Sequence, residues 1–170
     1  MKRTFRYVMA AMFAALTFVA TYFIQIPLAN GYANLGDAVI LICAVLFPSF
    51  TNLLAAGAGA AVADLASGFG IYAPATFLIK CGVFLIAMVL SRKNRLLSVL
   101  GCVLAELWMV LGYFLFEYFV AGLSTGALAS VPGNLLQGLV SVLAALILIP
   151  VMLRSEEIRR RADLYRGNHL

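Results

Sequence analysis

Long apolar runs follow one another along almost the whole chain, and only short polar stretches separate them. Of the 170 residues, 64% are hydrophobic and only 11% are charged. A water-soluble domain of this size has too little interior to bury so much apolar surface. The chain is therefore expected to use the lipid bilayer as its solvent.

The runs have the composition of membrane-spanning helices, which need about 20 residues to cross the hydrocarbon core. The sequence predicts an all-α integral membrane protein, a single domain over residues 1–170 with six transmembrane helices. The expected spans lie near Phe5–Ile26, Leu35–Phe47, Asn52–Ser67, Ala73–Leu90, Leu96–Ala121 and Asn134–Leu153. The second and third are short and only Pro48 separates them, which indicates a tight helical hairpin among longer neighbours.

The first span also resembles a signal peptide, because a basic start precedes its apolar core. The apolar run continues past the usual length of such a core, and no small-residue cleavage site closes it. We therefore expect an uncleaved first helix.

Basic residues lie before the first span, between the fourth and fifth, and after the sixth, whereas the loops between them contain no Lys or Arg. With six spans these three regions share one side, which the positive-inside rule makes cytoplasmic. Both termini are thus expected in the cytoplasm, with residues 1–4 as a short start and 154–170 as a basic tail. The tail is interpreted either as a lipid-surface segment or as a contact for a cytoplasmic partner.

Lys80 is the basic residue that this topology leaves unexplained, because it lies inside the fourth span. Charged residues within a membrane usually face a protein interior, a partner or a water-filled cavity. Helical spacing places polar residues on one stripe of each of three spans. The stripes are Tyr72, Thr76 and Lys80; Glu106, Tyr113 and Glu117; and Asn134, Gln137 and Ser141. Their similar depth predicts a pocket that opens to the outside.

Structural roles remain open for most of these residues. Lys80 can form a buried ion pair with Glu106 or Glu117 that only locks helices together. Glu117 can instead extend to the outer interface, and Asn134 can cap the sixth span after Pro132. Three further residues have such alternatives. Asp64 can satisfy backbone groups at the end of the third span, and Tyr72, like Tyr113, can be an interfacial aromatic.

Small residues form a second signal. Ala10, Ala11, Ala14 and Ala15 give two overlapping A-x-x-x-A pairs on the first span, and the third span contains the run "AAGAGAAVAD". Such faces let helices approach closely, either within the chain or against another protein.

Several segments resemble a known family. They are "AAMFAA" on the first span, "NLGDAVI" at the start of the second, and "ADLASGFGIYAPATFLIK" from the third into the fourth. Together with the six-span layout they resemble the substrate-binding S components of energy-coupling factor (ECF) vitamin transporters. The chain is most similar to the branch for vitamin B6 forms or hydroxymethylpyrimidine, which is related to riboflavin-type S components.

The resemblance implies an S component in a prokaryotic plasma membrane. It implies that a vitamin is captured from outside and delivered through a membrane coupling (T) subunit and two cytoplasmic ATPases. One of the alanine pairs, Ala10 with Ala14 or Ala11 with Ala15, would contact the T subunit. The segment "PLANGYANLGD" would gate the site, with Gly31 and Gly36 giving it mobility. The expected substrate contacts are Asn34, Asp37, Tyr72, Thr76, Lys80, Tyr113, Glu117, Asn134 and Gln137.

Other function classes fit the sequence less well. The chain has no phosphate-binding loop, so ATP hydrolysis must come from a partner, and neither an enzyme activity nor a cofactor or metal is expected. An autonomous secondary transporter would use Glu106 and Lys80 as a relay, but no inverted repeat is visible. A purely structural membrane subunit is the remaining alternative, and ligand binding would distinguish it from an S component. Nucleic-acid binding is not indicated.

Overall fold

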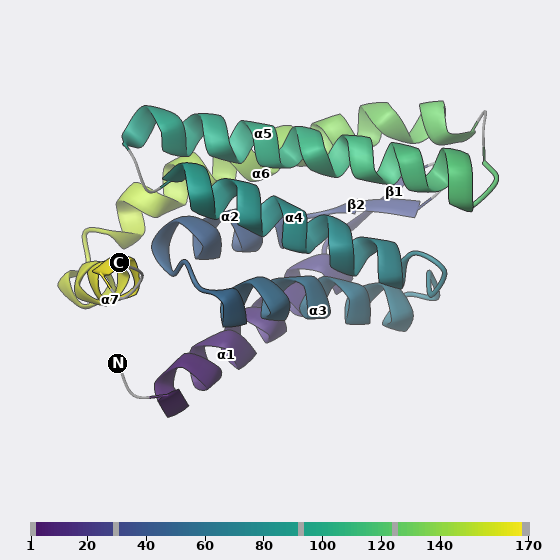
Figure 1. Cartoon of the computed structure of the whole chain (residues 1–170). Coiled ribbons are helices and arrows are strands. Elements are labelled where there is room, and N and C mark those ends of the chain that lie inside the picture. Colours follow the sequence, from purple (N-terminus) through teal and green to yellow (C-terminus); the bar gives the residue numbers. More distant parts are fainter. Residues whose placement is uncertain (1–2, 29–30, 92–93, 124–125, 168–170) are drawn as a thin grey trace.

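The computed structural model describes residues 3–28, 31–91, 94–123 and 126–167. Over these residues the chain forms a helical bundle with one short antiparallel hairpin (Figure 1). In chain order the elements are α1 (Arg3–Tyr22), β1 (Gln25–Leu28), β2 (Gly31–Asn34), α2 (Gly36–Leu46), α3 (Phe50–Ala66), α4 (Ala73–Ser91), α5 (Arg95–Leu115), the π-helical segment η1 (Phe116–Val120), α6 (Gly126–Met152) and α7 (Glu156–Gly167).

Four helical segments are long and apolar enough to cross a membrane: α1, α4, α5 with η1, and α6. Helices α2 and α3 are apolar but shorter, with 11 and 17 residues. The mostly helical character expected of a membrane protein is thereby confirmed. Six crossings and cytoplasmic termini stay predictions.

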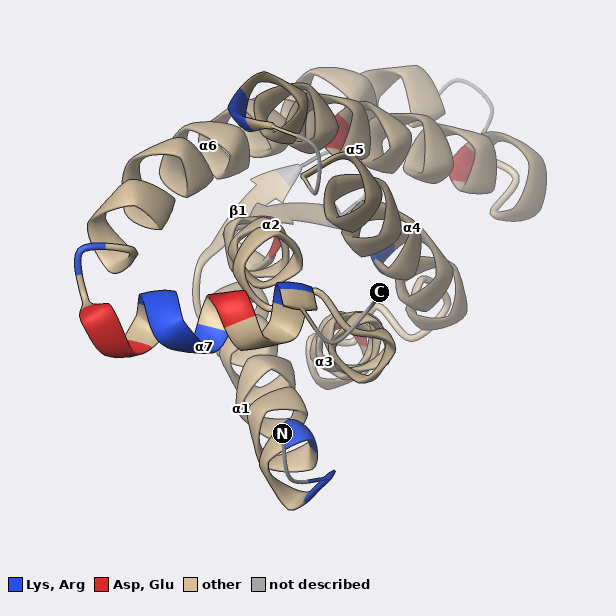
Figure 2. Ribbon diagram, turned by 60° about the vertical axis from the view of Figure 1, so that its left-hand side comes forward, with Lys and Arg blue, Asp and Glu red and all other residues tan. Residues whose placement is uncertain are grey.

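Helix α2 lies inside the bundle rather than at its surface. Ten of its 11 residues are buried, and it contacts α1, α3, α4 and α6. Figure 2 shows it enclosed by the longer helices. Because lipid tails are themselves apolar, close packing and polar contacts hold such a helix in place, rather than the hydrophobic effect.

The connection between α2 and α3 is the tight turn that Pro48 predicts. Ser49 is the N-cap of α3, and its hydroxyl accepts a hydrogen bond from the backbone N–H of Asn52 at 3.2 Å. The side chain of Asn52 donates back to the carbonyl of Phe47 at 2.7 Å. The turn therefore satisfies its own backbone groups between two buried helix ends.

Three boundaries differ from the sequence expectation. Helix α1 ends at Tyr22, and the residues after it form the β1–β2 hairpin instead of more helix. Helix α6 begins at Gly126, eight residues before Asn134, with Pro132 inside its second turn. The Gly- and Pro-containing stretch before Asn134 is thus largely helical. The residues after Ser155, expected only as a basic tail, form α7.

The small residues of α1 and α3 allow these two helices to touch through their backbones. A Cβ atom added to Gly59 would lie only 2.4 Å from the carbonyl oxygen of Ala14. No larger residue fits there without separating α1 from α3. The close approach expected from these small residues is confirmed, and here it occurs within the chain.

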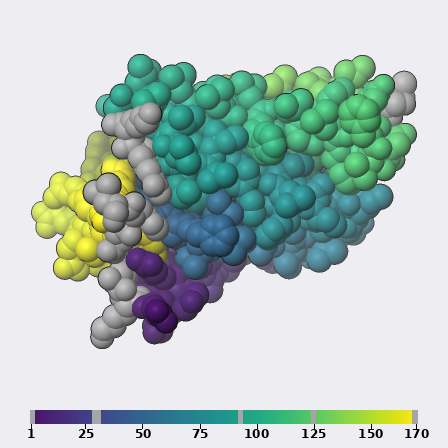
Figure 3. Space-filling view, in the orientation of Figure 1, coloured from purple at the N-terminus to yellow at the C-terminus, as the bar shows by residue number. Residues whose placement is uncertain are grey.

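The start of α1, the start of α5 and helix α7 all lie at one end of the bundle (Figure 1). Figure 2 shows that the described Lys and Arg residues gather at this end, apart from Lys80 on α4. In Figure 3, α7 (yellow) covers this end beside the start of α1 (purple). The charge distribution of the fold therefore matches the distribution expected from the positive-inside rule.

Candidate functional site

The charged centre of the bundle is an ion pair between α4 and α2. The ammonium nitrogen of Lys80 lies 2.7 Å from each carboxylate oxygen of Asp37. Both side chains are almost completely buried, with 3% and 0% of their surface exposed. The structural alternative for Lys80 was an ion pair with Glu106 or Glu117; a buried ion pair is present, but its partner is Asp37. Asp37 occupies the first turn of α2, the helix that the others surround.

Gln137 of α6 extends this ion pair towards the hairpin. Its amide nitrogen donates to the Oδ2 atom of Asp37 at 2.5 Å, and its amide oxygen accepts from the backbone N–H of Asn34 at 2.8 Å. The side-chain oxygen of Asn34 in turn accepts from the N–H of Gly36 at 2.9 Å. One chain of hydrogen bonds thus joins α4, α2, α6 and the end of β2.

The mobility expected of Gly36 in a gating segment stays a prediction, and the structure shows a packing role for this residue. It is the first residue of α2, it is buried, and a Cβ atom there would lie 2.1 Å from the hydroxyl of Thr21. Glycine is therefore needed for close contact with α1. Gly31 lies at the start of β2.

A second polar cluster lies between α3, α4, α5 and the hairpin. The Oδ2 atom of Asp64 accepts from the hydroxyl of Thr76 at 2.5 Å, and its Oδ1 atom accepts from the hydroxyl of Tyr32 at 2.7 Å. The hydroxyl groups of Thr76 and Tyr113 lie 2.9 Å apart. The ring of Tyr113 also connects the two clusters, because the ammonium of Lys80 lies 5.2 Å from its centroid.

Glu117 adds a third carboxylate at the far end of α5. It lies in the π-helical segment η1, is only 3% exposed, and accepts from the hydroxyl of Tyr72 at 3.4 Å. The alternative that Glu117 extends to the membrane surface is therefore wrong. π-Helical turns inside longer helices are frequent at functional sites.

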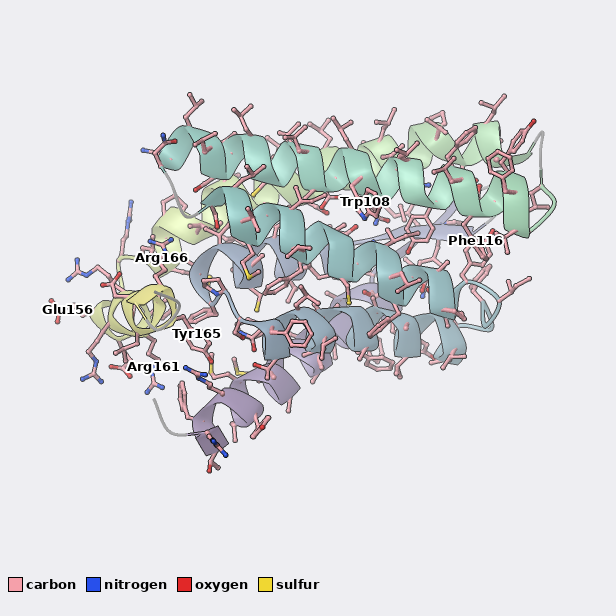
Figure 4. All side chains as sticks on the ribbon, viewed as in Figure 1. Trp108, Phe116, Glu156, Arg161, Tyr165 and Arg166 are labelled. Carbon is pink, nitrogen blue, oxygen red and sulfur yellow. The ribbon has the colours of Figure 1, made fainter. Side chains whose placement is uncertain are left out.

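Aromatic rings form a line beside these carboxylates. Tyr32 packs on Phe69 with ring centroids 5.3 Å apart, Phe69 lies 6.2 Å from Tyr72, and Tyr72 lies 5.2 Å from Phe116. Phe116 is labelled at this end of the bundle in Figure 4. The site thus combines buried carboxylates and hydroxyls with flat apolar surfaces, at the end opposite α7.

Asn134 and Glu106 belong to neither of the two polar clusters described above. Asn134 is buried on the same face of α6 as Gln137, but it lies inside the helix, so its role as an N-cap is wrong. Glu106 is 4% exposed and neither carboxylate oxygen has a hydrogen-bond partner among the described residues. It packs beside Gly138 between α5 and α6, deeper in the bundle than Tyr113.

The sequence predicts Tyr72 as a contact, but it gives Asp64 mainly a structural role and does not mark Tyr32 of the hairpin or Phe69 of the α3–α4 turn. Asp64 lies in the same short segment as the distinctive "ADLASGFG", which was the available signal. Nothing local marks Tyr32, since only the fold of the hairpin brings it to Asp64. Trp108, an aromatic residue of α5, does not join this line of rings. Its indole N–H donates to the carbonyl of Ile79 at 3.1 Å, and the residue is 43% exposed (Figure 4).

The two alanine pairs of α1 have different surroundings. Ala10 is 8% exposed and Ala14 faces α3 at Gly59, so this pair is used inside the chain. Ala11 and Ala15 lie about 100° further around the helix and are exposed. The described residues contain no cluster of His, Cys, Asp and Glu suited to a metal ion.

Comparison with known proteins decides the family. The profile of the family described as "ECF-type riboflavin transporter, S component" matches residues 2–154, which is most of the chain. The chain belongs to this family of ECF S components. An S component is the substrate-binding subunit of a transporter that works with a T component and ATPase subunits, and it is not an enzyme.

Two further comparisons give one related sequence and one structure of the same fold. This S component is 34% identical over 122 residues to a protein of Pyrococcus woesei described as "Uncharacterized protein in gap 3'region", covering 71% of this chain and 81% of the relative. Its fold matches a solved structure described as "Structure and mechanism of the S component of a bacterial ECF transporter" with a TM-score of 0.74. That match has 18% identity and covers 90% of this chain and 98% of the other.

Proposed function

We propose that this S component captures a small aromatic vitamin, a vitamin B6 form or hydroxymethylpyrimidine, from outside a prokaryotic plasma membrane. The observation that carries the proposal is the cluster of Asp64, Thr76 and Tyr113 beside the line of aromatic rings. Buried polar groups beside flat apolar surface suit a ligand with an aromatic ring and a few polar substituents.

The two polar clusters have different roles in this proposal. Asp37 is fully buried and its charge is paired with the ammonium of Lys80, so we assign its network to holding the helices and the hairpin in place; Asp64 has no ion-pair partner among the described residues. Asp64 and Glu117 lie nearer the end at which a ligand would enter. Their oxygens can accept hydrogen bonds from hydroxymethyl or amino groups, while Tyr72 and Phe69 stack on the ring. Asn34 and Asn134, the remaining expected contacts, stay predictions: Asn34 hydrogen-bonds Gly36 at the end of β2, and Asn134 is buried on α6.

Riboflavin is the second candidate, because the matching family is described by that vitamin. Its three-ring system needs more stacking surface and more hydrogen-bond partners than a single pyridine or pyrimidine ring. The two ligands can therefore be distinguished directly by binding.

The test is ligand binding to the purified full chain in detergent. Pyridoxine, pyridoxamine, hydroxymethylpyrimidine and riboflavin are titrated separately in a calorimeter, after mass spectrometry of any small molecule carried through purification. Saturable binding of a one-ring vitamin, weakened by Asp64→Asn, supports the proposal. Saturable binding of riboflavin alone supports the second candidate, and no binding of any of the four refutes both.

We further propose that the exposed pair Ala11 and Ala15 is the docking face for the T subunit. The other pair is occupied by α3, which leaves this one free to meet another helix closely. Transport energy then comes from the ATPase subunits that act with the T subunit. An autonomous transporter would instead move substrate without them.

A further inference from the structure

A cavity of about 460 Å³ lies at the end of the bundle opposite the proposed vitamin site. Residues of α2, α4, α5, α6 and α7 line it, so it lies where the α4–α5 connection meets the turn into α7. Neither the binding of a vitamin nor the docking of a T subunit on α1 uses this cavity. Its lining nevertheless has the character of a binding site.

The lining changes from charged to apolar with depth. Arg95 is the first residue of α5 and lies at the helix end, whereas Val99 and Cys102 lie one and two turns further into the bundle. On α6, Leu146 and Ile149 continue the apolar wall. A guanidinium at the mouth and hydrocarbon walls behind it suit an amphiphile rather than a simple ion.

Among the residues that the structure describes, no carboxylate neutralises either arginine of the cavity. Over the described residues, the ion pairs are Lys80 with Asp37 and Glu157 with Arg160 and Arg161, so neither Arg95 nor Arg166 has a carboxylate partner. Arg166 donates to the carbonyl of Val45 at the end of α2 at 3.2 Å. Figure 4 shows it directed from α7 towards the bundle, while Glu156 points away. Its other guanidinium donors remain available.

We propose that this cavity binds an anionic phospholipid, with the phosphate between Arg95 and Arg166 and the start of an acyl chain against Val99, Cys102 and Ile149. Helix ends lie at the level of lipid head groups, where arginines attract anionic lipids. Neighbouring side chains such as Leu96 and Leu100 are 69% and 44% exposed, so the outer side of α5 is itself apolar and suited to lipid. The bound lipid ties α7 to α5 and thereby fixes the end of the bundle.

The test uses the full chain, stripped of lipid in detergent and then titrated with phosphatidylglycerol, phosphatidylcholine or inorganic phosphate. Native mass spectrometry counts the bound lipid, and thermal unfolding reports its stabilisation. We expect saturable binding of phosphatidylglycerol and a decrease in affinity of about tenfold or more in the Arg95→Gln, Arg166→Gln double variant, since two charges are removed. Arg159→Gln is the matched control, because Arg159 is an exposed residue of α7 that does not line the cavity.

Two further variants keep the result decisive. Arg95→Gln alone removes no contact with a described residue, so it tests the phosphate even if loss of Arg166 disturbs α7. Val99→Trp fills the apolar part without changing charge and should also abolish binding. Equal phosphatidylglycerol affinity in all variants would overturn the proposal. So would equal binding of phosphatidylcholine, or equal stabilisation by phosphate alone, since the latter would assign a site for a free anion.

Discussion

Lys80 and Asp37 stabilise each other because neither charge can remain unpaired in the interior of the bundle. Removing one member of a buried ion pair leaves the other charge without compensation, whereas removing both together is often tolerated. The pair also fixes Gln137, and through it the end of β2. The charge that looked out of place in an apolar helix therefore sets the position of the hairpin.

Lys80→Met is expected to lower the free energy of unfolding by about 3–5 kcal/mol, because it leaves the Asp37 carboxylate buried and unpaired. The double variant Lys80→Met, Asp37→Asn should recover most of this loss. Thermal unfolding in detergent measures both. A double variant that is less stable than Lys80→Met would contradict the pairing.

Thr76→Val is expected to weaken vitamin binding, because it removes the hydroxyl that connects Asp64 with Tyr113. The loss of one buried hydrogen-bonding group is worth about 1–3 kcal/mol. Thr17→Val is the matched control: Thr17 is 1% exposed, and its hydroxyl has no hydrogen-bond partner among the described residues. Titration calorimetry compares the two variants, and equal effects would argue against a role for Thr76 in the site.

At the scale of the element, α1 has two faces with separate uses. One face packs on α3 through Ala14 and Gly59, and the other presents Ala11 and Ala15 with larger apolar neighbours such as Met12 and Leu16. A helix with small residues on two faces can pack closely against a second helix while it keeps its contact with the first. This division is consistent with the docking of the T subunit that we propose for the exposed pair.

Ala15→Leu, alone or with Ala11→Leu, is expected to abolish vitamin uptake in cells that contain the T and ATPase subunits. Binding by the purified chain should be unchanged, because α1 keeps its contact with α3. Ala129→Leu on the exposed side of α6 is the matched control and should leave uptake intact. If binding falls together with uptake, the exposed pair is needed for the fold rather than for docking. Gly59→Val should instead destabilise the bundle itself.

Helical periodicity predicted that polar residues of neighbouring spans meet, and the structure brings Thr76 to Tyr113 and Tyr72 to Glu117. Glu106, on the same stripe, has no hydrogen-bond partner among the described residues. Periodicity did not predict which carboxylate pairs with Lys80. That choice depends on the rotation of α2, whose apolar residues lie on all sides and so carry no phase information. Pro132 was taken as the boundary of α6, although the helix accommodates it in the second turn. The hydrogen bond between Tyr32 and Asp64 depends on the hairpin. The hairpin was not predicted, because the apolar run of the first span continues into it and favoured a longer helix.

At the scale of the molecule, α7 closes one end of the bundle. Tyr165 is 1% exposed and its ring meets Phe47 edge-to-face at 5.6 Å, while the guanidinium of Arg161 lies 4.5 Å from the ring of Phe5. Through Tyr165 and Arg161, α7 thus joins the α2–α3 turn to the start of α1. On the exposed side of α7, hydrogen bonds from Arg161 and Arg160 lower the pKa of the Glu157 carboxyl.

Tyr165→Ala is expected to lower the free energy of unfolding by about 3–5 kcal/mol, since it removes a fully buried ring. Tyr165→Phe keeps the ring and its contact with Phe47, so its effect should be much smaller. Denaturation of the two variants in the same detergent provides the comparison. Similar losses in both would show that the hydroxyl, rather than the ring, holds α7.

The burial of α2 has a consequence for biogenesis. At 1.5 Å per residue its 11 residues span roughly 16 Å, about half of the hydrocarbon thickness, and almost none of its surface faces lipid. If the translocon releases helices into the bilayer according to their affinity for lipid, α2 alone is not expected to be released. The final position of α2 requires α4 and α6, which leave the ribosome later. Asp37 can therefore pair with Lys80 and Gln137 only after most of the chain has been synthesised.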